Sequence, residues 1–281
     1  MHNIEDDMPE LPIATKPLIE QIFNDAAASY DNVGPSIFTQ FGKRLLEHMH
    51  LAPGMRVLDI ATGKGAALIP AAHLLGPEGR VIGIDLSDAI LQETERAVRM
   101  EVLTNVELHK MDAEHLEFPD QSFDAVTCSF ALFFFPDIEA ALREMYRVCK
   151  PGGCLAITYF NKTPPPFGPG LPILIQQLMA YRVGVQTPQP LSYTPQEVEA
   201  LLNRLGFRLI EINNEINDIV YKSGDEWWSF LLTLASRASI MGMDEEIRAR
   251  FKEEYLAKLR PMFGQDGLHM SLAIIYALAK R

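Results

Sequence analysis

The segment 57–65 constrains the fold more than any other part of the chain. It reads Val-Leu-Asp-Ile-Ala-Thr-Gly-Lys-Gly, so an apolar run ends in Asp59 and opens at once into a glycine turn at Gly63 and Gly65. A second apolar run ends in another carboxylate, Asp85. Two buried strands that each place an acid at their carboxyl end predict a nucleoside-binding cleft at the edge of an open parallel sheet.

The glycine pattern discriminates between classes of nucleotide. A dinucleotide fold requires G-x-G-x-x-G, and the third glycine position is Leu68 here. The phosphate-binding motif G-x-x-x-x-G-K-S/T does not occur either, because Lys64 stands between the glycines rather than after them. A turn that carries Asp59 and Gly63 suits a ligand with an ammonium group and no phosphate, and S-adenosylmethionine is such a ligand.

The next hundred residues alternate between strand and helix patterns. Strands are predicted at 105–111, 125–130 and 154–160. A helix is predicted to begin at Pro136-Asp137 and to end at the turn 150–153. One buried face of this helix is indicated by the spacing of Ile138, Ala141, Leu142, Met145 and Cys149. Such alternation indicates a parallel sheet with helices on both faces.

In this order, the segments resemble class I S-adenosylmethionine-dependent methyltransferases. The resemblance is to the branch that contains the ubiquinone/menaquinone biosynthesis C-methyltransferases and many small-molecule methyltransferases. It covers about residues 20–160 and depends on five ordered motifs. It implies an α/β fold with a seven-stranded, doubly wound, mostly parallel sheet and a helical cap. It also implies S-adenosylmethionine as the cofactor, with S-adenosylhomocysteine as its product.

The chain divides into a core and a cap. A capping box at Thr194–Glu197 predicts a helix that ends at Gly206. Strands are predicted at 207–212 and 271–279. The predicted parts are a helical leader at 1–50, a cofactor-binding core at 51–160, cap insertions at 161–191 and 215–265, and the remainder of the core sheet at 192–214 and 266–281.

The resemblance assigns roles to the cofactor-binding residues. Asp59 contacts the methionine ammonium, Asp85 accepts hydrogen bonds from both ribose hydroxyls, and Asp112 holds the adenine amino group. The structural alternative for Asp59 is a helix N-cap or a turn stabiliser, and for Asp112 it is an aspartate that caps a loop. Tyr30, in an Ala-x-x-Tyr-Asp element, closes over the cofactor carboxylate. The other implied contacts come from the glycine turn, the strand ends and the adenine face: Ala61, Gly63, Gly65, Leu86, Ala113, Ser129 and Phe130.

Methyl transfer can be accelerated by alignment and exclusion of water, so a base is needed only if the acceptor must lose a proton. Tyr159 and His269 are the candidate catalytic residues. The structural alternative is a core aromatic for Tyr159 and a surface or turn residue for His269. The candidate acceptor contacts are aromatic: Phe133, Phe134, Tyr193, Trp227 and Trp228.

These aromatic residues favour a hydrophobic acceptor such as a quinone precursor, a polyketide or another natural product. Packing of the cap on the core explains them equally well. The stretch after 125–130 lacks the D-P-P-Y or N-P-P-Y motif of amino-methylating nucleic-acid enzymes. The methylated atom (C, O or N) stays undecided, with C- or O-methylation expected ahead of N-methylation.

Composition limits the partners. A net charge of −12 argues against nucleic acid or an anionic membrane. No apolar run reaches the roughly 18–20 residues that span a bilayer, and the acidic N-terminus is unlike a secretory signal, so a cytoplasmic protein is expected. The three cysteines and scattered histidines give no metal signature. Oligomeric state cannot be read from the sequence.

Two other functions are compatible with the same cofactor motifs. A cyclase of natural-product biosynthesis can keep S-adenosylmethionine as a structural ligand on this fold. A binding subunit without catalytic activity is the third alternative, and the complete set of Gly63, Gly65, Asp85 and Asp112 disfavours it.

Overall fold

A single mixed sheet organises the chain. The computed structural model describes residues 13–32, 34–184, 187–234 and 236–281. All neighbouring strands are parallel except those that flank β8, which is antiparallel to both. In their order across the sheet, the strands are β3 (Val106–Lys110), β2 (Arg80–Asp85), β1 (Arg56–Ile60), β4 (Phe123–Ser129), β5 (Cys149–Asn161), β8 (Leu268–Lys280) and β7 (Arg208–Tyr221). The predicted fold is confirmed, and a short β6 (Ser192–Tyr193) additionally pairs with β5.

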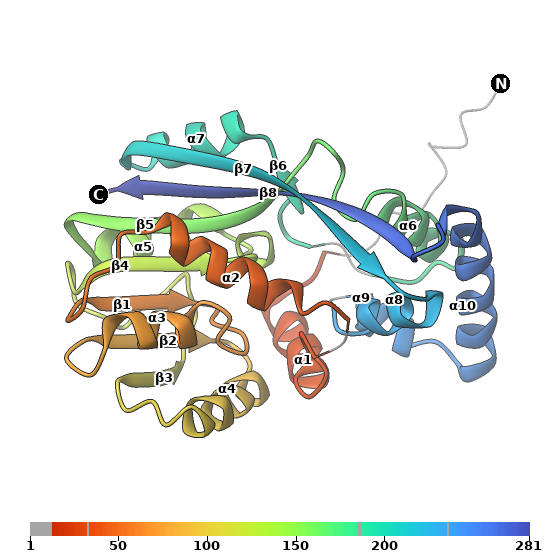
Figure 1. The fold of residues 1–281 in the computed structure, drawn as a ribbon, viewed down its shortest axis with the longest axis horizontal. Coiled ribbons are helices and arrows are strands. Elements are labelled where there is room, and N and C mark those ends of the chain that lie inside the picture. Colours follow the sequence, from red (N-terminus) through yellow and green to blue (C-terminus); the bar gives the residue numbers. More distant parts are fainter. Residues whose placement is uncertain (1–12, 33, 185–186, 235) are drawn as a thin grey trace.

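Helices cover both faces of the sheet (Figure 1). One face packs against α2 (Ile37–His48), α3 (Leu68–Leu75) and α4 (Asp88–Met100). The other packs against α5 (Ile138–Val148) and α7 (Pro195–Arg204). This double winding leaves the carboxyl ends of β1, β2, β3 and β4 together at one edge, where ligands bind in such sheets.

Local sequence signals determine where the helices of the second face begin. The Thr194 hydroxyl accepts the Glu197 backbone N–H, and the Glu197 carboxylate accepts the Thr194 N–H, so the predicted capping box is confirmed. Asp137 caps α5 by accepting the Ala140 N–H at 2.9 Å. These bonds satisfy backbone donors that have no partner within the helix.

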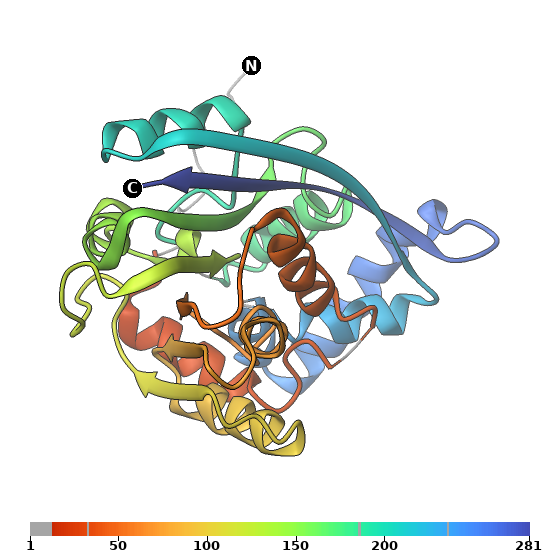
Figure 2. The ribbon, with the colours of Figure 1, turned by 60° about the vertical axis from the view of Figure 1, so that its left-hand side comes forward.

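The last two strands are longer than predicted. Pairing begins at Arg208↔Lys280 and continues to Tyr221↔Leu268, so β7 and β8 extend as a two-stranded ribbon from the core into the cap (Figures 1 and 2). Residues 213–218 are mostly polar, and this hides the alternation that would have predicted a strand. β5 also begins early, at Cys149, and the predicted turn 150–153 forms an irregularity within it.

The cap is built from both ends of the described chain. It consists of α1 (Lys16–Ala26), α6 (Gly170–Ala180), α8 (Gly224–Leu231), α9 (Ser236–Met241) and α10 (Glu245–Leu259). α1 contacts α4 of the core and α9 of the cap, and Figure 1 shows it between them. The first 12 residues of the predicted leader lie outside the described residues.

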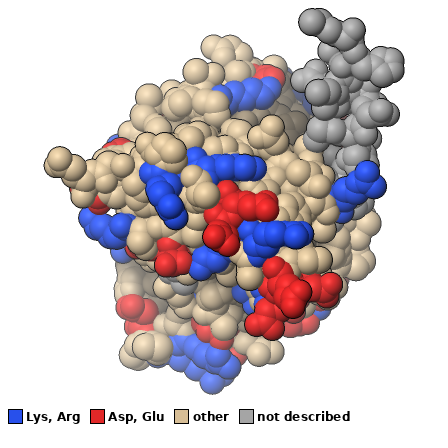
Figure 3. Space-filling view, turned by 90° about the vertical axis from the view of Figure 1, so that its right-hand side faces the viewer, with Lys and Arg blue, Asp and Glu red and all other residues tan. Residues whose placement is uncertain are grey.

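The end of the molecule that carries α10 presents acidic and basic side chains together rather than a surface of one sign (Figure 3). Among the described residues, no helix combines the length and the apolar character that crossing a membrane requires.

Candidate functional site

The glycine turn after β1 brings the backbone close to the strand ends. Ala61, Gly63 and Gly65 all have positive φ, at 51°, 53° and 84°. Glycine adopts this left-handed conformation readily, whereas the alanine side chain is strained in it. Backbone of this kind beside a cavity commonly marks a ligand site.

Asp59 lies at the end of β1 and is 2% exposed. Its carboxylate accepts hydrogen bonds from the Thr62 hydroxyl at 2.6 Å and the Thr127 hydroxyl at 2.7 Å. Burial raises the pKa of Asp59 to about 6, against the lowering effect of the two hydroxyls. A cationic ligand group would favour the ionised form of this carboxylate.

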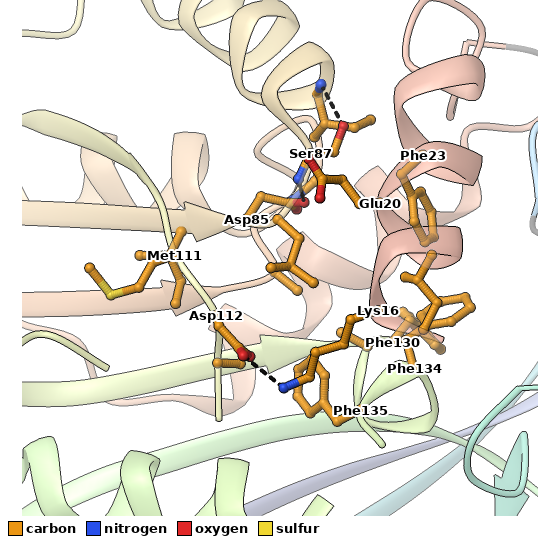
Figure 4. Close-up of a pocket in the computed structure, with 18 of the residues that line it drawn as sticks. Lys16, Glu20, Phe23, Asp85, Ser87, Met111, Asp112, Phe130, Phe134 and Phe135 are labelled. Carbon is orange, nitrogen blue, oxygen red and sulfur yellow. Dashed lines mark hydrogen bonds and ion pairs between the residues drawn. The ribbon is translucent and has the colours of Figure 1, made fainter. Parts of the chain in front are cut away.

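Asp85 ends β2 and faces a cavity at the strand ends, which we call the main cavity (Figure 4). One carboxylate oxygen accepts the Gly63 N–H at 3.1 Å, and the other accepts the Ser87 N–H at 3.0 Å. Burial raises the pKa of this group, and the backbone N–H groups oppose that rise. A carboxylate has about four lone-pair positions, so Asp85 can still accept two ligand hydroxyls.

Asp112 follows β3 and lies opposite α1. Its carboxylate forms an ion pair with Lys16 at 2.7 Å (Figure 4). The same ammonium contacts Glu114 at 2.5 Å. Two further contacts hold α1 in this position: the Asn24 side chain accepts the Ser87 hydroxyl, and Glu20 pairs with Lys110. α1 therefore lies across the carboxyl ends of β2 and β3.

The main cavity is small. Its volume is about 70 Å³, whereas an engineered protein cavity that binds benzene measures about 150 Å³. Leu86 and Ala113 also line it, together with Ser129 at the end of β4. The polar groups suit a nucleoside, and we expect α1 to shift outward when one enters.

A second, larger cavity lies between the core and the cap. Its volume is about 630 Å³, which is typical of a small-molecule site. Among the described lining residues there is no Asp, Glu, His, Lys, Arg or Cys, so the wall is apolar and aromatic apart from a few hydroxyl and amide groups. It is formed by Ile13, Phe23, Tyr30, Phe38, Phe130, Phe133, Phe134, Phe160, Phe167, Leu171, Leu174, Ile175, Leu178, Met179, Thr187, Pro188, Gln189, Pro190, Leu191, Leu234, Ser236 and Ser239.

Four aromatic residues line both cavities and therefore mark their junction: Phe23, Tyr30, Phe130 and Phe134. The Tyr30 ring stacks on Phe38 at 5.4 Å, and burial raises the pKa of the Tyr30 hydroxyl well above its usual value. Phe130 has a positive φ of 52°, and its N–H donates to the Thr158 hydroxyl at 3.0 Å. The structure thus holds a strained aromatic residue at the junction.

The predicted site residues separate into two groups. The predicted cofactor contacts line the main cavity or the small cavity beside Asp59, except Gly65, which lines neither. Phe133 and Phe134 of the predicted acceptor contacts line the large cavity described above. Tyr159 lies on the opposite face of β5, fully buried among residues packed against α5 and α7. Its neighbour Phe160 faces the large cavity instead, because successive side chains of a strand point to opposite faces.

The remaining candidates do not line either cavity. Tyr193 packs edge-on against Tyr159, with 5.1 Å between ring centroids. Trp228 packs against α10, and Trp227 lies behind Phe167 with its ring centroid 6.0 Å away. We therefore do not retain these residues, or Tyr159, as reacting or acceptor-contacting groups.

His269 is exposed on the β7–β8 ribbon. Its two ring nitrogens contact the carboxylates of Asp218 at 2.5 Å and Asp266 at 3.0 Å. These carboxylates raise the pKa of His269. Such a surface ion-pair cluster has no access to the cavities, so a catalytic role for His269 is not supported.

Sequence reasoning missed Lys16, Phe23, Phe38 and Phe160. The first two are on α1, within the predicted helical leader, and that prediction did not indicate which side chains reach the strand ends. Phe160 was missed because both faces of β5 are buried, so its apolar run does not reveal which side faces a cavity.

Comparison with known proteins identifies the family. The ubiE/COQ5 methyltransferase family matches residues 13–170, more than half of the chain. The chain belongs to this family. It is therefore an S-adenosylmethionine-dependent methyltransferase, and S-adenosylmethionine is its cofactor, as the sequence predicted.

Two relatives and one solved structure show how far the similarity extends. The aklanonic acid methyltransferase DauC of Streptomyces sp. (strain C5) is 37% identical over 164 residues, which are 56% of this chain and 74% of DauC. The ubiquinone/menaquinone biosynthesis C-methyltransferase UbiE of Ectopseudomonas mendocina is 37% identical over 180 residues, 62% of this chain and 67% of that protein.

Among solved structures, the [4+2]-cyclase SpnF superimposes with a TM-score of 0.58 at 18% identity, covering 97% of this chain and 99% of SpnF. This similarity shows the shared fold and nothing of the reaction.

Proposed function

We propose that this chain methylates a hydrophobic, aromatic small molecule of the quinone-precursor or polyketide class in the large cavity. The observation that carries the proposal is the large apolar cavity of about 630 Å³, which meets the main cavity, the proposed cofactor site, at Tyr30 and Phe130. UbiE is named for ubiquinone and menaquinone biosynthesis and DauC for aklanonic acid, and these names support acceptors of this class.

Each carboxylate at the strand ends is assigned to one part of the cofactor. Asp85 accepts the ribose hydroxyls, Asp112 accepts the adenine amino group, and Asp59 faces the methionine ammonium. The backbone at Ala61 and Gly63 lies in close contact with the cofactor. Leu86 and Ala113 lie against the adenine, while Ser129 and Phe130 line the route toward the acceptor. What supports this arrangement is the lining of the main cavity and of the small cavity beside Asp59.

Bound S-adenosylmethionine supplies an activated methyl group. The aromatic wall excludes water and aligns the acceptor, which contributes by proximity and desolvation. No described side chain of the large cavity can take up a proton near neutral pH, since the Tyr30 hydroxyl retains its proton. The acceptor must therefore carry its own acidic group, such as the enol of a 1,3-dicarbonyl or an acidic phenol. Such groups react at carbon or oxygen.

The test is methylation of defined acceptors. The purified protein is incubated with S-adenosylmethionine and hydroxynaphthoquinones or aromatic polyketides of graded acidity, and products are identified by mass spectrometry. We expect methylated products, with kcat/KM following the ionisation of each acceptor. If none of these acceptors is methylated, the proposed acceptor class is wrong. If the pH profile is the same for all acceptors, the enzyme supplies the base and this part of the proposal fails.

The cyclase alternative predicts a different result in the same assay. A polyene would be consumed without formation of S-adenosylhomocysteine. Measuring this product alongside the acceptor therefore separates the two functions.

A further inference from the structure

A third, small cavity lies beside the glycine turn and is more polar than the other two. It adjoins the main cavity, with which it shares Tyr30, Ala61, Gly63, Ser129 and Phe130. Its charged lining residues are Asp31, Asp59 and Lys64. An extended ligand whose nucleoside lies at Asp85 can therefore reach this cavity with its other end.

The two acids of the small cavity already have partners within the protein. The Asp31 carboxylate accepts the N–H groups of Phe38 and Thr39, at 3.2 and 2.9 Å, and the Thr39 hydroxyl at 2.6 Å. It thereby caps the first turn of α2. Asp59 accepts its two threonine hydroxyls. Both acids are thus held in place before any ligand binds.

Lys64 is in a different situation. It is half-buried and is the sole cation among the described residues that line this cavity. Its ammonium forms no ion pair within the described part of the chain, although the carboxylates of Asp31 and Glu93 attract it from a distance. Burial lowers the pKa of Lys64. A partly desolvated ammonium without a direct partner is unfavourable, and an anionic ligand group would relieve this.

We propose that Lys64 binds the α-carboxylate of the cofactor's methionine portion. The amino-acid end of the cofactor carries one ammonium and one carboxylate, and the small cavity offers Asp59 for the first and Lys64 for the second. The inference rests on the proposed placement of the nucleoside at Asp85 and Asp112. It assigns a function to the residue that stands between the two glycines of the turn.

Two ligands isolate this interaction. S-adenosylhomocysteine carries the amino-acid end, whereas 5′-methylthioadenosine carries the same nucleoside and thioether without it. Their dissociation constants are measured by calorimetry for the wild-type protein and for Lys64→Gln, Lys64→Arg and Lys43→Gln. Lys43 is exposed on α2 and lines none of the three cavities, so its variant controls for the loss of one positive charge.

Lys64→Gln is expected to weaken S-adenosylhomocysteine binding at least about tenfold, because a hydrogen bond to a charged group is lost. Binding of 5′-methylthioadenosine should stay within about twofold of the wild type, and Lys64→Arg should restore much of the loss. Lys43→Gln should leave both affinities unchanged.

Two results would overturn parts of this account and can be told apart. If Lys64→Gln weakens both ligands equally or neither, the assignment of Lys64 is wrong while the proposed cofactor site stands. If the wild-type protein binds neither nucleoside, the proposed site itself fails, and the inference fails with it. Thermal melting of each variant identifies a loss of affinity that arises from unfolding.

Discussion

The main cavity and the large cavity are lined by different kinds of side chain. The main cavity places Asp85 and Asp112 in fixed positions on strand ends, held by backbone N–H groups and by Lys16. The large cavity has no charged side chain among its described lining residues and is formed largely by aromatic and aliphatic groups. Directed hydrogen bonds select a chemical group, whereas an apolar wall selects size and shape.

The two cavities also differ in where their residues come from. Every proposed cofactor contact lies within residues 13–170, the region that matches the family. Much of the large cavity comes from later segments: α6 beyond residue 170, residues 187–191 and residues around α9. The cofactor part is thus the part shared with relatives, while the acceptor part includes segments outside the match. The following experiments test this division.

Asp85→Ala should have the largest effect. Two hydrogen bonds to a charged group are lost, at roughly 1.5–3 kcal/mol each, so the affinity for S-adenosylhomocysteine should fall by about 100-fold or more. Calorimetry measures this, with Asp225→Ala, an exposed carboxylate on α8, as the matched control. An unchanged dissociation constant would remove Asp85 from the cofactor site.

Ile175→Lys tests the large cavity. Ile175 lines this cavity and is 40% exposed, so a lysine fits without unfolding the cap but brings a charge to the apolar wall. We expect KM for a hydrophobic acceptor to rise about tenfold, since the acceptor loses apolar contacts there, with no change in cofactor affinity. Ile247→Lys makes the same change at a similarly exposed position on α10. Equal effects of the two variants would contradict the assigned acceptor site.

The pH dependence of cofactor binding tests Asp59. Its folded-state pKa of about 6 lies above its unfolded value of 3.8, so protonation stabilises the cofactor-free protein. This stabilisation is fully present below about pH 4 and is lost as the pH rises through about 6. Because the ligand ammonium requires the ionised carboxylate, affinity for S-adenosylhomocysteine should fall by up to about tenfold per pH unit below pH 6.

Asp59→Asn provides the control for this measurement. The amide cannot ionise, so calorimetry between pH 5 and 8 should show weak binding with a much flatter pH dependence. A variant that keeps the wild-type profile would show that another group titrates.

Trp227→Phe should give the smallest effect. The Trp227 indole N–H donates to the Tyr255 hydroxyl at 2.8 Å, and that hydroxyl donates to the Gly170 carbonyl at 2.9 Å. Loss of one buried hydrogen bond costs about 1 kcal/mol, which lowers Tm by about 2–4 °C. Differential scanning calorimetry measures this. A change in acceptor KM with unchanged Tm would instead place Trp227 in contact with the acceptor.

Several parts of this protein follow from sequence because their causes are local. The strand runs that end in Asp59 and Asp85, the glycine turn and the Thr194 capping box each depend on a few adjacent residues. Their order predicts the parallel sheet, and the family resemblance that they carry implies the cofactor, which the family match confirms. The roles of the carboxylates at the strand ends stay a prediction. Strand ends of a parallel sheet necessarily meet at one edge, so residues distant in sequence could be assigned to one cleft.

The acceptor side depends on tertiary structure. Tyr159 and Phe160 are adjacent and both buried, and only the packing of the two sheet faces decides that Phe160 faces the large cavity while Tyr159 lies in the opposite core. The polar residues 213–218 become strand because β8 supplies their hydrogen-bond partners. Lys16 reaches Asp112 across 96 positions of sequence because α1 packs against α4. No local pattern encodes these contacts, since each depends on a partner that the fold brings near.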